Sequence, residues 1–300
     1  MRPAPLAMPA AARNDARPKP PPRPSYEALR VFARNPSALA GVLLLAAILA
    51  LTIFGPMAMQ ADPFEIAAAP MEPPGGEMLL GSDYLGRDVL TGMIYGGRAT
   101  LLVGVVAAVL SMAIGITIGA LAGYYGGWID ETLMRITEFF QVLPTLLFAM
   151  VLVTLFTPSL ATIAVAIGVV SWTGTARLAR GEFLRLKRRE YVLAERVIGA
   201  GDARIIWRVI LPNALAPLIV SATLAIGTAI LFEAGLSFLG LGDPNVMSWG
   251  LMIGSNRPYI LTAWWAVTLP GAAIFLTVLA VSLIGDGLND ALNPNSRGRA

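Results

Sequence analysis

The stretch SALAGVLLLAAILALTIFGPMAM, residues 37–59, decides the fold class, because it holds no charged residue over a length that can cross a membrane. The uncharged run extends from Asn35 to Ala61. A helix needs about 20 consecutive apolar residues to cross a hydrocarbon core of ~30 Å. Of the 300 residues in the chain, 56% are hydrophobic and 14% are charged, so we expect a membrane protein throughout.

Four further uncharged runs continue this pattern. The runs 99–129, 209–232 and 258–285 are each long enough for one span. The run 139–176 is close to twice that length and contains Thr-Pro-Ser at 157–159, so we predict two helices joined by a tight turn there. Barrel strands would instead alternate over ~10 residues. The sequence therefore predicts an all-α polytopic membrane protein with about six transmembrane helices.

The distribution of charge predicts which segments lie in the cytoplasm. Residues 1–34, rich in Pro and Arg, hold seven basic and two acidic residues, and we expect a flexible cytoplasmic N-terminal tail. The next loop, 62–98, holds six acidic and two basic residues. The interval 177–208 holds nine basic and four acidic residues, so it also lies inside. Residues 35–295 would form the transmembrane domain, and 296–300 a cytoplasmic C-terminal tail.

A charged segment, YVLAERVIGAGDARIIWRVILP (191–212), interrupts the apolar runs. Residues 191–198 can form two helical turns, and Gly199 suits a left-handed helix stop. Asp202 is a plausible N-cap of a second helix, which we expect Pro212 to end or bend near the membrane surface. Because so short an amphipathic helix is unstable alone, its apolar face must lie on lipid or on protein. The pattern leaves both alternatives open.

The same segment resembles the cytoplasmic EAA loop of prokaryotic ABC importer permeases, whose pattern is E-A-A, three residues, G, nine residues, I, one residue, L-P. The glycine and the Leu-Pro pair match, whereas Leu193, Glu195 and Val209 depart from the pattern. In that family the loop forms a coupling helix seated in a groove of the ATP-hydrolysing subunit. Within a coupling loop at 177–212, the resemblance assigns docking to Tyr191, Leu193, Ala194, Glu195, Gly199, Ala200, Leu211 and Pro212.

Four further motifs resemble this family. They are LGSDYLGRDVLTGMIYGGRATLLVG (80–104), GYYGGWIDETLMRITEFF (123–140), EAGLSFLGLGDPNVMSWG (233–250) and LTVLAVSLIGDGLNDALNP (276–294). Over about residues 25–295 the chain resembles the C-type permease subunit of the dipeptide, oligopeptide and nickel branch. The resemblance implies the ABC importer type I permease fold in the cytoplasmic (inner) membrane of a bacterium.

The resemblance also implies partners and an energy source. A second homologous permease would complete the translocation pathway, two ABC ATPase subunits would hydrolyse ATP, and an extracytoplasmic solute-binding protein would deliver the substrate. Di- or oligopeptides are the expected cargo, with nickel, heme and opines as alternatives. Because the basic residues flank apolar runs, they indicate membrane topology and no nucleic-acid partner.

The residue types present limit the chemistry of the chain itself. No Cys and no His occur, which removes thiol nucleophiles, imidazole bases and the common zinc sites. No G-x-x-x-x-G-K-[ST] phosphate loop occurs either. We expect a transport subunit without catalytic, metal or cofactor-binding residues. A gradient-driven secondary transporter or an intramembrane enzyme would need ionisable residues inside the spans, and the long uncharged runs contain none.

Two outer positions are candidates for a gate or for contact with the binding protein. Asp83, Arg87 and Asp88 precede the second long uncharged run, where they could receive a partner or could cap and anchor an interfacial helix. Glu233 lies at the outer end of the fifth span, near water. An ionisable group there is a functional candidate, although it could also bond neighbouring backbone.

Glycines mark one helix face in GITIGALAG. Gly115, Gly119 and Gly123 recur at four-residue spacing, which gives a smooth face where another helix can approach closely. Ordinary helix packing and a face against a partner subunit are both compatible with this spacing.

Overall fold

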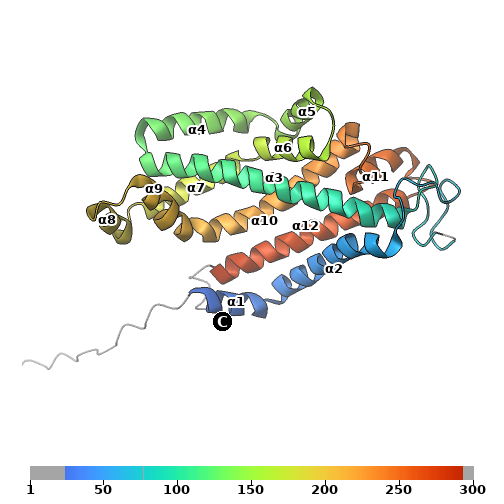
Figure 1. Ribbon diagram of the computed structural model, residues 1–300, viewed down its shortest axis with the longest axis horizontal. Helices are drawn as coiled ribbons and strands as arrows, with labels where there is room; N and C mark the ends of the chain where they lie inside the picture. The colour runs from blue at the N-terminus through green and yellow to red at the C-terminus, as the bar shows by residue number, and fades with distance from the viewer. Residues whose placement is uncertain (1–23, 77, 293–300) are drawn as a thin grey trace, which may run out of the picture.

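Four continuous helices long and apolar enough to cross a membrane run lengthwise through the computed structural model, which describes residues 24–76 and 78–292 (Figure 1). They are α2 (Pro36–Met59), α3 (Val89–Tyr125), the helix Asp202–Leu241 and α12 (Trp265–Leu292). The third consists of α9 (Asp202–Arg204), a π-helical segment (Ile205–Ile210), α10 (Leu211–Leu236) and a second π-helical segment (Ser237–Leu241).

Two bent helix pairs supply the remaining spans. Helix α4 (Gly127–Val142) meets α5 (Thr145–Leu155) at 87°, and α6 (Leu160–Val170) meets α7 (Thr173–Leu186) at 44°. Pro144 stands directly before α5, and the preceding Leu143 is extended, as the residue before a proline prefers. If each pair counts as one span, the chain has six, which agrees with the expected number.

The division of the run 139–176 differs from the prediction. The break at 157–159 is confirmed, because it lies between α5 and α6. The two predicted helices are α5 and α6, but neither is a complete span, since each has 11 residues and reaches only about 16 Å. Each needs its bent neighbour to cross. Those neighbours, α4 and α7, carry charged residues such as Asp130 and Arg177 and therefore extend beyond the uncharged run.

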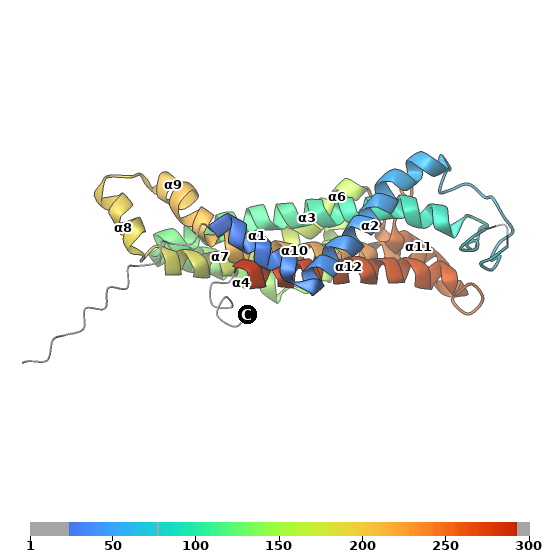
Figure 2. The ribbon, with the colours of Figure 1, turned by 90° about the horizontal axis from the view of Figure 1, so that it is seen from below.

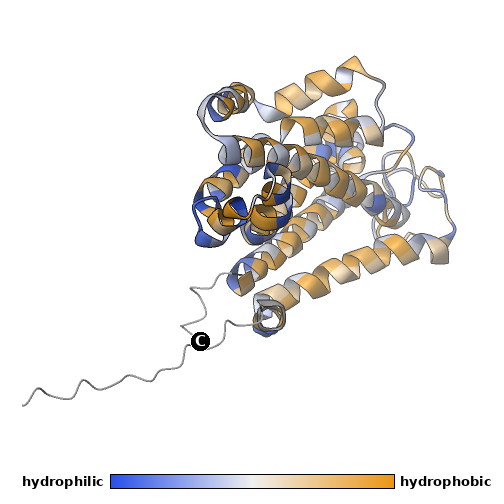
Figure 3. Ribbon diagram, turned by 60° about the vertical axis from the view of Figure 1, so that its left-hand side comes forward, coloured by the Kyte–Doolittle hydropathy of each residue, from blue (hydrophilic) through white to orange (hydrophobic). Residues whose placement is uncertain are grey.

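Shorter helices lie at the two ends of the bundle (Figures 1 and 2). Helix α8 (Glu190–Val197) lies at one end, and α11 (Trp249–Asn256), a 3-10 turn (Arg257–Tyr259) and the loop 60–88 lie at the other. Hydrophilic residues gather at the α8 end, whereas the long helices are mainly hydrophobic (Figure 3). The two ends therefore carry different surfaces.

The segment 24–34, expected to belong to the flexible tail, forms helix α1 (Pro24–Arg34). Phe32 holds it against α12, because a Cβ added at Gly287 would lie 3.1 Å from the Phe32 ring. Phe32 is half-buried, and its ring gives the segment a hydrophobic contact that composition alone did not indicate. The remaining tail residues, 1–23 and 296–300, lie outside the described residues.

The glycine face on α3 packs against α7 of the same chain. A Cβ added at Gly115 would lie 2.5 Å from Thr175 Cβ, and one at Gly123 would lie 2.7 Å from the carbonyl oxygen of Arg180. At Gly119 it would meet the carbonyl oxygen of Ala176. These contacts support the packing interpretation of this face, because α7 of the same chain covers the glycines.

Candidate docking site on helix α8

Helix α8 is anchored by one side chain and exposes most of its other apolar ones. Val192 is fully buried in a cluster that includes Phe183 and Ile205. By contrast, Leu193 is 47%, Val197 87% and Ile198 75% exposed. Large apolar side chains exposed together on a short helix mark an interaction surface. Leu193, Val197 and Ile198, with the 41% exposed Tyr191, form what we call the docking surface.

A glycine fixes where α8 ends. Gly199 has φ +84°, its N–H donates to the carbonyl of Arg196 at 3.0 Å, and the N–H of Ala200 donates to the carbonyl of Glu195 at 3.0 Å. These two bonds and the left-handed glycine make a Schellman helix end. The predicted left-handed stop at Gly199 is confirmed, and it sets the direction in which the chain leaves the docking surface.

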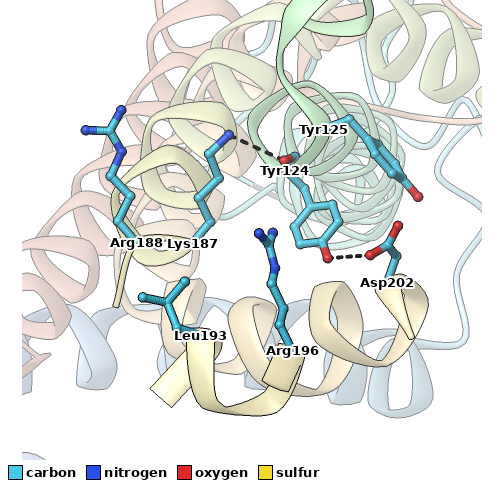
Figure 4. A pocket seen from close by; sticks show the side chains of 7 residues that line it. All are labelled: Tyr124, Tyr125, Lys187, Arg188, Leu193, Arg196 and Asp202. Atoms are coloured by element: carbon cyan, nitrogen blue, oxygen red, sulfur yellow. Dashed lines mark hydrogen bonds between the residues drawn. The ribbon is translucent and has the colours of Figure 1, made fainter. Parts of the chain in front are cut away.

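Asp202 links the docking segment to α3 and does not cap a helix. The N-cap of α9 is Gly201, and it makes no side-chain bond. The Asp202 carboxylate instead accepts a hydrogen bond of 2.6 Å from the Tyr124 hydroxyl at the end of α3. The Arg196 guanidinium of α8 lies 5.1 Å from the centre of the Tyr124 ring (Figure 4). The predicted N-cap role of Asp202 is therefore wrong: Gly201 occupies the N-cap position, and the Asp202 carboxylate is hydrogen-bonded to Tyr124 instead.

A basic recess of about 640 Å³ lies beneath α8 (Figure 4). Burial lowers the pKa of the Lys187 ammonium, and the positive charge of Arg188 lowers it further. Lys187 also donates a long hydrogen bond of 3.4 Å to the Tyr124 carbonyl. Lys187, Arg188 and Arg196 outnumber the one acid, Asp202, so the recess carries positive charge that an acidic partner group could balance. Its lining residues are Tyr124, Tyr125, Lys187, Arg188, Leu193, Arg196 and Asp202.

The other predicted docking residues separate into outer and inner positions. Ala194 is exposed and Ala200 is half-buried. Ala194 follows Leu193 and Ala200 follows Gly199, so both lie next to the docking surface. Glu195 turns inward: its side chain is 27% exposed, lies 3.7 Å from the Arg204 guanidinium, and has a buried oxygen without a hydrogen bond. Leu211 and Pro212 lie beyond α9, at the start of α10.

Pro212 does not end the helix that contains it. The π-helical segment Ile205–Ile210 comes directly before it, and the Leu211 N–H donates five residues back, to the Ile206 carbonyl. A proline has no N–H to donate, and its ring crowds the carbonyl four residues earlier, so wider π-type turns let the chain continue. The expectation that Pro212 ends the helix is wrong, because a single 40-residue helix runs through it. A bend at Pro212 stays a prediction.

The outer candidates hold local structure. The Asp83 carboxylate accepts hydrogen bonds from the N–H groups of Leu85 and Arg87 at 2.8 and 2.9 Å, and is 7% exposed. Asp88 is the N-cap of α3. The Arg87 guanidinium lies over the Phe64 ring at 5.1 Å. These contacts support the capping and anchoring alternative, and contact with a binding protein stays a prediction.

Glu233 lies inside the protein, not at a water interface. It is fully buried and accepts hydrogen bonds from the Thr100 hydroxyl at 3.0 Å and the Ser237 hydroxyl at 2.8 Å. Its partners are therefore side chains of α3 and the second π-helical segment, not the neighbouring backbone. The backbone N–H of Trp249 donates to the Thr100 hydroxyl at 3.3 Å, and this bond joins α11 to the same network. A gating role for Glu233 stays a prediction.

Tyr124, Lys187 and Arg196 were not singled out from the sequence. Tyr124 lies in the motif 123–140, and no local pattern indicates that its hydroxyl reaches Asp202, 78 residues later. Among residues 24–76 and 78–292, no group of three or more Asp or Glu side chains could hold a metal ion.

Comparisons with known proteins give consistent results. Residues 115–298 match the family of binding-protein-dependent transport system inner membrane components, and residues 24–74 match the N-terminal TM domain of oligopeptide transport permease C. The chain is 42% identical to the di/tripeptide transport system permease protein DppC of Pseudomonas aeruginosa, over 93% of this chain and 95% of that protein. It is 36% identical to the oligopeptide transport system permease protein OppC of Bacillus subtilis, over 90% of each.

A solved structure shares the fold. The MetNI methionine ABC transporter, in an inward-facing conformation, contains a chain that superposes with a TM-score of 0.57 at 20% sequence identity. The match covers 67% of this chain and 96% of that chain. At this identity the likeness shows the fold alone.

Proposed function

Because the chain belongs to the family of binding-protein-dependent transport system inner membrane components, it is a permease subunit of an ABC importer, and we propose that it carries di- and oligopeptides. The relatives named for di/tripeptide and oligopeptide transport support this cargo. They match nine tenths of the chain, so the likeness includes the pathway as well as the docking segment. Nothing observed favours a gradient-driven transporter.

The docking surface on α8 carries the mechanistic part of the proposal. Val192 ties α8 to the interior, and Leu193, Val197 and Ile198 stay exposed. Such a surface would be stabilised by an apolar groove on a partner protein. We propose that this partner is an ABC ATPase, that a second copy of the ATPase binds a second permease, and that ATP is bound and hydrolysed by these subunits and not by this chain.

Transport would follow from movement of α8. Closure of the ATPase pair on ATP would displace the docking surface, and Val192 with the Tyr124–Asp202 bond would pass that displacement to α3. A second permease would complete the pathway, and an extracytoplasmic binding protein would deliver peptide at the opposite end. This arrangement places α8 and both termini in the cytoplasm, as the excess of basic residues supports.

Isolation of the complex tests the proposal. A tagged full-length chain, purified from its own membrane in mild detergent, is expected to bring with it an ABC ATPase and a second permease. The same complex in proteoliposomes is expected to take up peptides only when ATP and a loaded binding protein are supplied. Uptake driven by an ion gradient without ATP would contradict the proposal.

A further inference from the structure

A second recess lies among the membrane helices, far from the docking surface. It has a volume of about 180 Å³ and lies between α3, the α6–α7 pair and α10. No charged or aromatic side chain lines it. Its polar side chains are all hydroxyls, contributed by Ser111, Ser171, Thr175, Ser221 and Thr228, and small residues such as Ala107, Ala108 and Gly174 leave the space open.

The recess lies near the middle of α3. Ser111 lies four positions past Ala107, the central residue of Val89–Tyr125. A rise of 1.5 Å per residue places it about 6 Å from the midpoint of this helix. A hydrocarbon core of ~30 Å has its centre ~15 Å from either surface. A span centred on the membrane therefore keeps Ser111 well inside the hydrocarbon core.

Two of these hydroxyls have no hydrogen-bond partner among the described residues. The oxygens of Ser111 and Ser171 are buried and unpaired, and Ser111 as a residue is 2% exposed. A buried polar group without a partner is unfavourable, and more so where lipid replaces water. Thr175 has only the Met112 sulfur at 3.5 Å, which is a weak acceptor. The recess thus holds unused hydrogen-bonding capacity at a depth where such capacity is costly.

We propose that this recess binds the backbone amide groups of a peptide in transit, an inference that rests on the proposed function. A hydroxyl can donate to a peptide carbonyl and accept from a peptide N–H, so the same lining serves any sequence. Without charge or aromatic rings, the site does not select among peptide side chains. Binding is also weak enough for release, as a conduction pathway requires.

An open face of α7 leads from the recess toward the α8 end. Gly174 lines the recess, and Gly181 lies seven residues further along α7. A Cβ added at either glycine would meet nothing within 4 Å. This face of α7 therefore has room for a solute between the recess and the end of the bundle.

A helix of the second permease is the competing occupant, because small residues and hydroxyls also favour helix packing in membranes. The two occupants differ in access to water. Since the chain has no Cys, single cysteines can be introduced without background from this subunit. We choose Thr228→Cys and Ser221→Cys in the recess, because Thr228 is exposed and Ser221 half-buried. Val109→Cys is the control, because Val109 is 62% exposed but does not line the recess.

The first experiment measures labelling of these cysteines in the assembled complex in proteoliposomes, with a small, water-soluble thiol reagent. Thr228→Cys and Ser221→Cys are expected to react, and to be protected about 3-fold or more when loaded binding protein and ATP drive peptide through. Val109→Cys is expected to react slowly and without protection. Absence of labelling in the recess, or crosslinking of Thr228→Cys to the second permease, would overturn the inference.

The second experiment removes hydroxyls with little change of shape, by Ser111→Ala and Thr228→Val. Each is expected to lower the turnover of peptide uptake about 2- to 10-fold, the range expected for one lost hydrogen bond. The affinity of the binding protein for peptide and the recovery of ATPase with the chain should stay unchanged. Unaltered uptake in both variants would reject the inference. If the wild-type complex itself lacks ATPase or peptide uptake, the proposed function fails instead.

Discussion

Single residues set the geometry of the docking surface. Gly199 turns the chain because it adopts φ +84°, and Val197 is 87% exposed whereas Val192 on the same helix is buried. The two residues act in different ways. Gly199 acts through the backbone conformation, and Val197 acts through its apolar surface, so their variants separate the position of α8 from the contact that it makes.

Replacing Gly199 by Val is expected to weaken ATPase association about 10-fold. A β-branched residue in the left-handed region costs about 1–2 kcal/mol, and no neighbouring atom adds to that cost, since an added Cβ meets nothing within 4 Å. The matched control is Gly201→Ala, because Gly201 has φ −69° and is equally open. Affinity is measured with purified ATPase on the detergent-solubilised permease. Equal losses in both variants would show that the positive φ is irrelevant.

Val197→Asp is expected to weaken ATPase association about 10-fold or more, because the interface would bury a charge without a partner. Val197 is 87% exposed and, unlike Leu193, does not line the basic recess. Leu261→Asp serves as the control, since Leu261 is 95% exposed and follows the 3-10 turn Arg257–Tyr259. The amount of ATPase that co-purifies with the chain is the measurement. Wild-type recovery with Val197→Asp would place the docking surface elsewhere.

At the scale of elements, α3 contacts both the docking segment and α7. Its last turn bonds α9 through Tyr124 and Asp202, and its glycine face lies against α7. Asp130 of α4 also pairs with Arg180 of α7, with contacts of 2.5 and 2.7 Å, so α4 moves with the same unit. Movement of α8 would therefore be transmitted to several helices at once.

Tyr124→Phe is expected to raise the ATP hydrolysed per peptide transported about 3-fold. The variant loses the 2.6 Å bond to Asp202 but keeps the ring over which Arg196 lies. Because Asp202 is exposed, we expect a loss of about 1 kcal/mol, which loosens α8 from α3 without unfolding either helix. Tyr125→Phe is the control, since Tyr125 is 47% exposed. An unchanged ratio in Tyr124→Phe would exclude this link.

Gly119→Val is expected to destabilise the permease by about 1–3 kcal/mol, because any Cβ there meets the carbonyl of Ala176 in α7. Gly271→Ala on α12 is the control, since a Cβ there has open space and alanine favours a helix. Thermal unfolding in detergent compares the two. A normal unfolding temperature for Gly119→Val would mean that α3 and α7 separate more readily than their close approach implies.

At the scale of the whole molecule, the two ends of the bundle carry different candidate sites. One end carries the docking surface, the basic recess and α1, and the other carries the loop 60–88 and α11, with the buried Glu233 network close to it (Figures 1 and 2). The hydroxyl-lined recess lies between these ends. A signal from ATP and a peptide from the binding protein would thus enter from opposite sides.

Reaction with a membrane-impermeant thiol reagent should show that the two ends lie on opposite sides of the membrane. Leu79→Cys is expected to react in intact cells, and Trp128→Cys, at the start of α4, only after the membrane is opened, since both side chains are well exposed at 70% and 76%. Trp128 is chosen because it lies outside the docking surface that the ATPase would cover. Reaction of Trp128→Cys in intact cells would reverse the orientation that the charges predict.

The sequence by itself determined the membrane class, six spans, the short helix with its stop at Gly199, and the family likeness. These follow from local properties: uncharged runs, helix periodicity and a glycine that can take positive φ. The tertiary structure alone decided that α5 and α6 are each too short to cross the membrane without their bent neighbours. It also decided that Gly115, Gly119 and Gly123 face α7, and that the Tyr124 hydroxyl bonds Asp202. It also buried Glu233 and gathered five hydroxyls around one recess. Each of these depends on contacts between segments far apart in the chain, and packing, not local composition, selects such contacts.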